Sequence, residues 1–294
     1  MCFQLNLFKV FPLLLCSVLL ENAELSAFRF IDCSSCHVKI SAEWRSSMHA
    51  QSTTSPVFLK ESGGSLSSGK SSCSCHAPSY LPPQNLGMIP GMREDSLELG
   101  VDCVACHMDS DLVAYSSGEE LMVPHWVKKS DTYARGSFCA GCHTWGKTGG
   151  LDCQDCHMPD IEGAAGDGPH LERREGATHA SHLWSGSRNP QTLARGALLE
   201  AHRLGGTLSV KVTNLVGVHS FPANGHHKMK VVLIPSPLGQ PAWEDSVKLG
   251  PDSTAEYSVK LPGSETADRV ELRFYPAPSV WPDSFYVLTK KVVD

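Results

Sequence analysis

The chain of 294 residues has little charge, few aromatic residues and no long hydrophobic segment after its first twenty residues. Charged residues make up 19% and aromatic residues 7%. This composition excludes a coiled coil and a highly charged disordered chain. The 31 Asp+Glu outnumber the 25 Lys+Arg, giving a net charge of −6. The sequence therefore lacks the basic face of a nucleic-acid-binding protein, and we expect no nucleic-acid partner.

The N-terminus has the pattern of a secretory signal peptide. Lys9 precedes an apolar run over 10–20, which is too short to span a bilayer, and small residues follow at Ala23, Ser26 and Ala27. We predict a signal peptide over residues 1–27. The mature chain is then secreted across the inner membrane, without a transmembrane span, and resides in the periplasm or at the cell surface and beyond.

Cysteine and histidine are abundant instead, with 12 Cys and 14 His, most of them before residue 183. Beyond Cys2 and Cys16, ten cysteines form five pairs, and a histidine directly follows every pair. Disulfides or zinc sites would use cysteine pairs, but neither requires that histidine. C-x-x-C-H is the attachment motif of haem c, in which two thiols bind the porphyrin and the histidine binds the iron. Four intact copies occur: Cys33, Cys36 and His37; Cys103, Cys106 and His107; Cys139, Cys142 and His143; Cys153, Cys156 and His157. The sequence therefore predicts a multihaem cytochrome c.

The fifth pair is one residue shorter than the others. It consists of Cys73, Cys75 and the adjoining His76. A haem could attach here through one or both thiols, or the pair could be the remnant of a lost site. The predicted cofactor content is therefore five haems c, or four if this site is not loaded.

Nine further histidines are available as second axial ligands of the irons. His49 ends a helix predicted over 41–51, and His125 stands between Pro124 and Trp126, which stiffen its approach. For the fifth position, His170, His226 and His227 are alternatives to His179. The predicted distal ligands are His49, His125, His182, His219 and His179.

The end of the chain differs in character from the rest. From residue 206 onward there is no cysteine, and apolar residues alternate in short runs between turns rich in Pro and Gly. Strands are predicted over 208–212, 229–235, 257–261, 270–274 and 285–293. We expect an α+β chain: an irregular and helical multihaem domain over 28–190, a helix over 192–200, and a small antiparallel β-sandwich over 206–294.

Several of these segments together resemble the multihaem cytochromes of the c-552/4 (c-554-like) kind. The matching segments are a W-x-x-S-x-H-A helix, a pair of F-C-x-x-C-H and C-x-x-C-H-M-P motifs, an H-x-W-x-G element and a histidine loop before a strand, at 44–50, 138–143, 153–159, 182–186 and 212–222. The resemblance implies bis-histidine haems in closely packed pairs, electron transfer, and residence in the periplasm or beyond.

Two classes of function follow from the sequence. An electron carrier exchanges electrons with redox partner proteins, and assembly into a filament is a structural variation of it. An enzyme acting on a small nitrogen or sulfur compound requires one haem with an open position. The chain offers enough histidines to leave no haem open, so the carrier is the preferred prediction.

Overall fold

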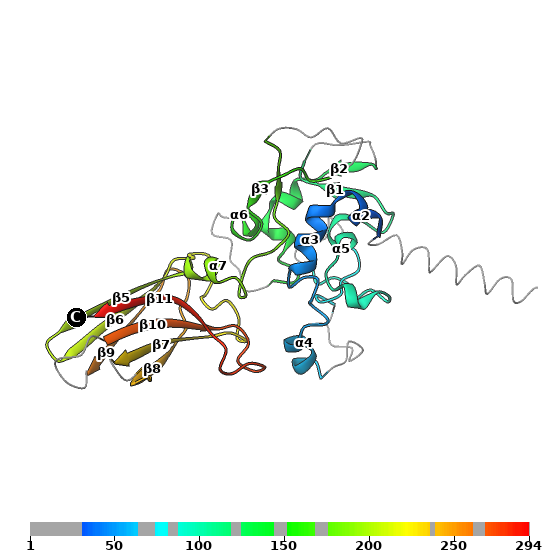
Figure 1. Ribbon diagram of the computed structural model, residues 1–294. Coiled ribbons are helices and arrows are strands. Elements are labelled where there is room, and N and C mark those ends of the chain that lie inside the picture. Colours follow the sequence, from blue (N-terminus) through cyan, green and yellow to red (C-terminus); the bar gives the residue numbers. More distant parts are fainter. Residues whose placement is uncertain are drawn as a thin grey trace, which may run out of the picture. The chain divides into compact units, whose positions relative to one another are not determined.

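The computed structural model describes residues 31–63, 74–81, 88–118, 125–143, 152–167, 176–235, 239–260 and 268–293. The chain divides into two compact units (Figure 1). The first contains the described residues up to 54, those between 66 and 133, and those between 160 and 183. The second contains residues 55–65, 134–159 and the described residues from 184 onward. The predicted signal peptide and Cys73 lie outside the described residues.

The first unit consists of short helices and two-stranded ladders joined by irregular segments. Its elements are α2 (Ile31–Cys36), α3 (Val38–Ser46), η2 (Leu97–Leu99), α5 (Cys103–His107), β1 (Ala114–Ser116), β2 (Val127–Lys129), η3 (Asp131–Ala134), β3 (Asp160–Glu162) and β4 (Thr178–Ala180). Strands β1 and β2 pair in parallel, and β3 and β4 pair antiparallel. This confirms the predicted irregular and helical character.

Helix α3 begins and ends earlier than the sequence pattern predicts. It covers Val38–Ser46 in place of 41–51, because Ser47 adopts an extended conformation with φ −81° and ψ 163°. Its buried face carries Ser41 and Trp44, and the indole N–H of Trp44 donates to the Val101 carbonyl at 2.7 Å. The helix is thus fixed by one aromatic side chain that also satisfies its polar atom.

The second unit is dominated by an antiparallel sandwich. Its helices are α4 (Pro56–Glu61), η4 (Gly136–Phe138), α6 (Cys153–His157) and α7 (Pro190–Ala194). Its strands are β5 (Ala197–Leu204), β6 (Thr207–Asn214), β7 (Lys228–Pro235), β8 (Trp243–Val247), β9 (Thr254–Lys260), β10 (Asp268–Tyr275) and β11 (Tyr286–Val293).

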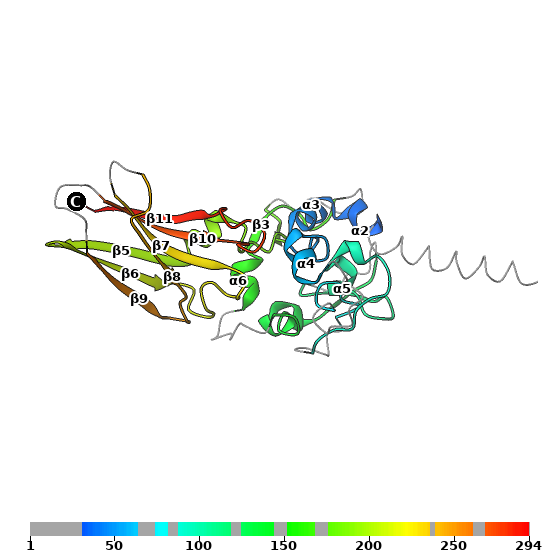
Figure 2. The same cartoon turned by 90° about the horizontal axis from the view of Figure 1, so that it is seen from below.

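The strands form two sheets that face each other (Figure 2). One sheet has the order β11-β10-β7-β8 and the other the order β5-β6-β9. Leu199 and Val210 of the three-stranded sheet share one core with Leu272 and Phe274 of the four-stranded sheet, and all four are at most 1% exposed. The predicted sandwich is confirmed, and its apolar alternation reflects this buried interface.

The segment at the start of the sandwich was predicted wrongly as a helix over 192–200. Helix α7 ends at Ala194, and the chain continues as strand β5, which pairs with β6 along its whole length. Ala197 and Leu199 are buried while Leu198 is 43% exposed, so the alternation belongs to a strand. The turn between helix and strand uses Gly196, where a Cβ atom would lie 2.7 Å from the Phe221 ring. Strand β8 was also missed by the sequence pattern.

Among the described residues, no helix is both long enough and apolar enough to cross a membrane.

The sandwich core makes a direct stability prediction. Leu272→Ala removes a fully buried side chain between the sheets and should lower the free energy of unfolding by about 2–5 kcal/mol. The matched control is Leu204→Ala, because Leu204 is 85% exposed and its loss should change stability by less than about 0.5 kcal/mol. Urea unfolding, monitored by proteolysis of the sandwich strands, measures the free energy of unfolding of both variants. Equal losses of stability in the two variants would contradict the placement of Leu272.

Candidate haem-binding sites

The cysteine motifs fold as single helical turns. Helices α5 and α6 each begin at the first cysteine of a motif and end at its histidine, and α2 ends at Cys36, directly before His37. Residues three and four positions apart lie on one face of a helix. One turn therefore directs two thiols and an imidazole toward the same side, as a single haem requires.

Aspartates at the first turn hold these motif helices in place. The Asp102 carboxylate accepts from the Ala105 backbone N–H at 2.7 Å and lies 3.2 Å from the Arg93 guanidinium, with both side chains buried. Asp152 forms a capping box with Asp155 at the start of α6. The caps satisfy backbone N–H groups that a helix of five residues cannot satisfy itself.

Thiols of different motifs lie in contact in pairs. The Cys103 thiol forms a hydrogen bond with Cys33, and this bond together with burial raises the pKa of Cys103. Burial, with the neighbouring Cys153, raises the pKa of Cys139 to about 12. The motif of Cys33 therefore adjoins that of Cys103, and the motif of Cys139 adjoins that of Cys153. The second of these proximities agrees with the short spacing of the last two motifs in the sequence.

Four of the five motif histidines share one type of anchor. The carbonyl oxygen bonded to each Nδ1 can only accept, so Nδ1 carries the hydrogen and Nε2 carries the lone pair. A metal-binding histidine is oriented in the same way. The bonds join His37 to Ala165 at 2.6 Å, His76 to Ser52 at 2.9 Å, His107 to Tyr115 at 3.0 Å and His157 to Ser185 at 2.8 Å.

Three motif histidines face a second histidine. The ring centres are 6.2 Å apart for His37 and His125, 6.1 Å for His107 and His182, and 6.4 Å for His157 and His219. The structure thus brings three of the predicted distal ligands opposite a motif histidine. Two of them repeat the anchor, with Nδ1 of His182 donating to Ala180 and Nδ1 of His219 to Ser220, each at 2.8 Å.

The separation of these rings fits a metal ion between them. An imidazole nitrogen binds a first-row metal at about 2.0–2.1 Å and lies about 1.1 Å from its own ring centre, given ordinary bond lengths. Two imidazoles on opposite sides of one metal therefore have ring centres about 6.3 Å apart. The donor set suits a haem iron with two histidine ligands.

The buried histidines of one pair are neutral at physiological pH. Burial, reinforced by the neighbouring His107, lowers the pKa of His182 to about 4. Burial also lowers the pKa of His107, although its bond to the Tyr115 carbonyl acts in the opposite direction. Neutral imidazole is the form that binds a metal, so no proton has to be displaced from this pair.

Tyr133 is a site residue that the sequence analysis missed. Its ring stacks on His107, with the ring centres 5.5 Å apart and the planes at 10°, and its hydroxyl donates to the Cys106 carbonyl at 2.6 Å. One side chain thus supports both the ring and the backbone of a haem motif. No motif surrounds Tyr133 in the sequence, so only the fold reveals this role.

His179 differs from the other predicted distal ligands. Its Nδ1 bonds to the Gly163 carbonyl at 2.9 Å, and its Nε2 bonds to the Glu43 carboxylate at 3.0 Å. Both ring nitrogens are therefore engaged with oxygen acceptors. The structure places His179 near His182, through their shared contact with Glu43, and does not place it opposite a motif histidine.

His49, His76 and His143 complete the predicted set within the described residues. His49 follows α3, and its carbonyl accepts from the Val101 N–H at 2.9 Å. The Ser52 hydroxyl bonds to the carbonyls of both His49 and His76, at 2.8 and 2.7 Å. The second ligands of His76 and His143 stay predictions, with His49 available for one of them.

The described cysteines do not form disulfides with one another. In the same part of the chain, no three side chains of His, Cys, Asp or Glu gather as a zinc site would require. Their arrangement follows the turn of each C-x-x-C-H motif instead.

Comparison with known proteins agrees with this geometry. Residues 32–108 match the family model of cytochrome c554 and c-prime. The likeness to this family covers this segment of the chain. With its four C-x-x-C-H motifs, the chain is a multihaem c-type cytochrome.

The fold of this cytochrome also occurs in a solved structure. The penta-heme cytochrome c552 from Thermochromatium tepidum is similar, with a TM-score of 0.63 and 18% sequence identity. The similarity covers 88% of this chain and 97% of that one. At this identity the likeness establishes the fold alone. A search of curated proteins found no match.

The buried Arg93–Asp102 pair offers a test of how the motif helix is held. Asp102→Ala removes a helix cap and leaves a buried guanidinium without its carboxylate, so it should lower the free energy of unfolding by about 3–5 kcal/mol. Asp111→Ala is the exposed control and should change stability by less than about 0.5 kcal/mol. Urea unfolding measures the free energy of unfolding of both variants. If Asp102→Ala lowered it as little as Asp111→Ala does, the cap would be dispensable.

Proposed function

We propose that this cytochrome is an exported electron carrier whose haem irons are held by pairs of histidines. When bound, haem supplies one-electron redox chemistry at its iron. The motif cysteines would attach the haem covalently, and pairs of histidines would hold its iron. With both positions filled by histidine, a haem has no open position at which a substrate could bind.

The observation that carries this proposal is the spacing of the histidine pairs. His125, His182 and His219 come from different parts of the chain, and each faces a motif histidine with ring centres 6.1–6.4 Å apart. We assign them as the distal ligands of the haems bound through His37, His107 and His157. His49 stays a proposed distal ligand. We do not assign His179 as a distal ligand, because both of its nitrogens bond to oxygen atoms.

Five haems are the proposed cofactor content. His76 has the same Nδ1–carbonyl anchor as the histidines of intact motifs, which supports a haem at the shortened Cys73–Cys75 site. The relative of similar fold is a pentahaem protein, which agrees with this number.

Contacts between motifs support electron transfer from haem to haem. The thiols of Cys33 and Cys103 touch, and so do those of Cys139 and Cys153. His37 also lies close enough to His107 to influence its protonation. We infer that two closely spaced haem pairs form within the chain, one at the motifs of Cys33 and Cys103 and one at the motifs of Cys139 and Cys153.

Location and partners follow from the export signal and the charge. The predicted signal peptide over 1–27 places the mature protein in the periplasm or at the cell surface. Haem propionates add to the net charge of −6, so redox partners with basic docking surfaces are expected. Assembly into a filament stays a prediction. The domain limits 28–190 and 206–294 also stay a proposal.

Carbon monoxide tests the axial assignment, because it binds only a ferrous haem with an open position. The reduced protein should show no spectral change, whereas His219→Ala should open one haem per chain to carbon monoxide. His202→Ala is the control, because His202 is exposed on β5 and should behave like the unaltered protein. Rapid binding to one haem of the unaltered protein would instead favour an enzyme acting on a small nitrogen or sulfur compound.

The intact mass of the denatured mature protein tests the fifth site, because thioether-bound haem survives denaturation. We expect five haems in the unaltered protein and four in Cys75→Ser. Equal masses of four haems in both proteins would show that the shortened site carries none.

A further inference from the structure

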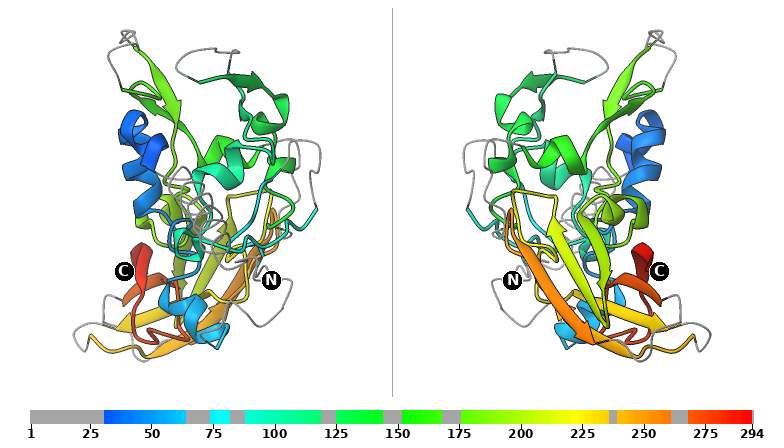
Figure 3. Two further views of the ribbon diagram at one scale, coloured as in Figure 1. Left: turned by 90° about the vertical axis from the view of Figure 1, so that its right-hand side faces the viewer. Right: turned by 90° about the vertical axis from the view of Figure 1, so that its left-hand side faces the viewer.

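Residues 162–167, which are distant in sequence, form hydrogen bonds with helices α2 and α3 at the first haem motif. The Asp167 N–H donates to the Cys36 carbonyl at 2.6 Å, and the Lys39 ammonium donates to the Glu162 carbonyl. In Figure 3, the hairpin of β3 and β4 runs beside the blue helix α3. The segment that leaves this hairpin carries His182, so α3 is in a position to control a ligand of another haem.

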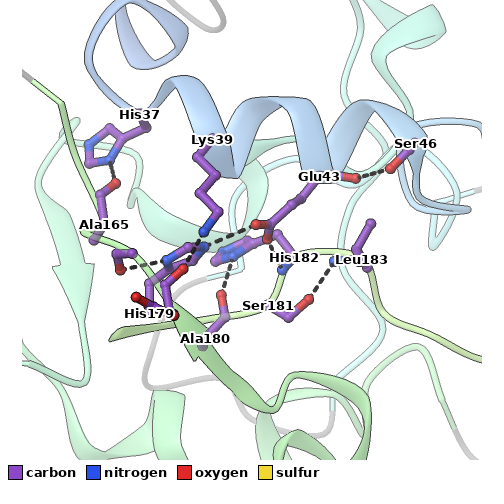
Figure 4. A network of polar contacts seen from close by, with 12 residues as sticks. His37, Lys39, Glu43, Ser46, Ala165, His179, Ala180, Ser181, His182 and Leu183 are labelled. Carbon is purple, nitrogen blue, oxygen red and sulfur yellow. Dashed lines mark hydrogen bonds and ion pairs between the residues drawn. The ribbon is translucent and has the colours of Figure 1, made fainter. Parts of the chain in front are cut away.

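Glu43 provides the contact between α3 and this ligand segment (Figure 4). One carboxylate oxygen accepts from the His179 ring at 3.0 Å, and the other accepts from the backbone N–H of His182 at 2.9 Å. The Glu43 side chain is 10% exposed and that of His179 is 2% exposed. A single buried carboxylate thus binds the ligand residue itself and a neighbour three positions before it.

The Glu43 carboxylate engages the second ring nitrogen of His179. Nδ1 of His179 bonds to the Gly163 carbonyl at 2.9 Å, and Nε2 bonds to this carboxylate at 3.0 Å. Both ring nitrogens of His179 are therefore used, and neither is available to an iron.

His182 is itself held at two points. Glu43 fixes its backbone N–H, and the Ala180 carbonyl fixes its ring through Nδ1 at 2.8 Å. These two bonds leave the peptide and the ring little freedom to turn. In this orientation the ring lies opposite His107, with the ring centres 6.1 Å apart.

We propose that Glu43 and His179 are positioning residues that keep His182 on the iron bound through His107. This inference rests on the axial pairing proposed above. Removing one member of a buried hydrogen-bonded pair is costly anywhere in a protein. The specific feature here is that Glu43 bonds directly to the ligand residue, so its loss should release one axial ligand as well as weaken the fold.

The experiment removes the acceptor atoms of Glu43 and measures whether one haem opens. Glu43→Leu keeps a similar volume but accepts no hydrogen bond, so the reduced variant should bind carbon monoxide at one haem per chain. Because His182 still competes for the iron in Glu43→Leu, the apparent affinity of this variant for carbon monoxide should be at least about tenfold weaker than that of His182→Ala. This tenfold difference corresponds to about 1.4 kcal/mol. The haem number from the intact mass must equal that of the unaltered protein. Glu43→Ala replaces the leucine variant if that variant does not load its haems fully.

A conservative variant separates positioning from general destabilisation. In Glu43→Gln the amide oxygen can still accept from the His182 N–H, and its NH₂ group can donate to a neutral His179. This variant should bind no carbon monoxide, whereas a loosened fold would open haems in both variants. Glu61→Gln is the matched control, because Glu61 forms a comparable pair with His226 at 2.9 Å on the exposed surface of the other unit.

Two outcomes overturn the inference and can be told apart. If His182→Ala opens one haem but fully loaded Glu43→Leu opens none, Glu43 does not position the ligand, and the axial pairing is unaffected. If His182→Ala opens no haem, the pairing of His107 with His182 is wrong, and the positioning role falls with it.

Discussion

The arrangement of this cytochrome depends on the hydrogen bond between the Nδ1 of each anchored histidine and a backbone carbonyl. The bond sets the tautomer and turns the ring, so that Nε2 points toward the position of the iron. His107 and His157, on their motif helices, and His182 and His219, on irregular segments, are all held in this way. The carbonyls come from Tyr115 and Ser185 for His107 and His157, and from the neighbouring residues Ala180 and Ser220 for His182 and His219.

The two units reach stability by different physical means. Among the described residues of the first unit, the buried apolar side chains are Trp44, Ala77, Val104 and Ala105. The sandwich of the second unit instead has a continuous apolar core shared by its two sheets. With so little apolar side chain to bury, the first unit relies on buried polar pairs, on helix caps and, once loaded, on the porphyrins. Its polar pairs therefore combine structure with control of the ligands, as Glu43 illustrates.

Local sequence determined those features in which neighbouring residues carry the chemistry. The C-x-x-C-H spacing places thiols and imidazole on one helical turn, so His107 and His157 could be assigned without a structure. Period-two alternation likewise identified strands such as β6 and β10, because one face of each is buried. Within the helix predicted over 192–200, Leu and Ala favour a helix by propensity, but from residue 197 onward pairing with β6 overrides that preference.

The sequence alone therefore established the haem c type of cofactor and the presence of a terminal sandwich, and it predicted the motif ligands, since each depends on contacts within a few residues. Only the tertiary structure decided the pairing of histidines, because His37 and His125, or His107 and His182, meet through chain segments whose course no local pattern encodes. The tertiary structure also decided the partners of His179, although its sequence context resembles that of a ligand. Its Nε2 contacts the carboxylate of Glu43, a residue far away in the chain, so this nitrogen is already engaged.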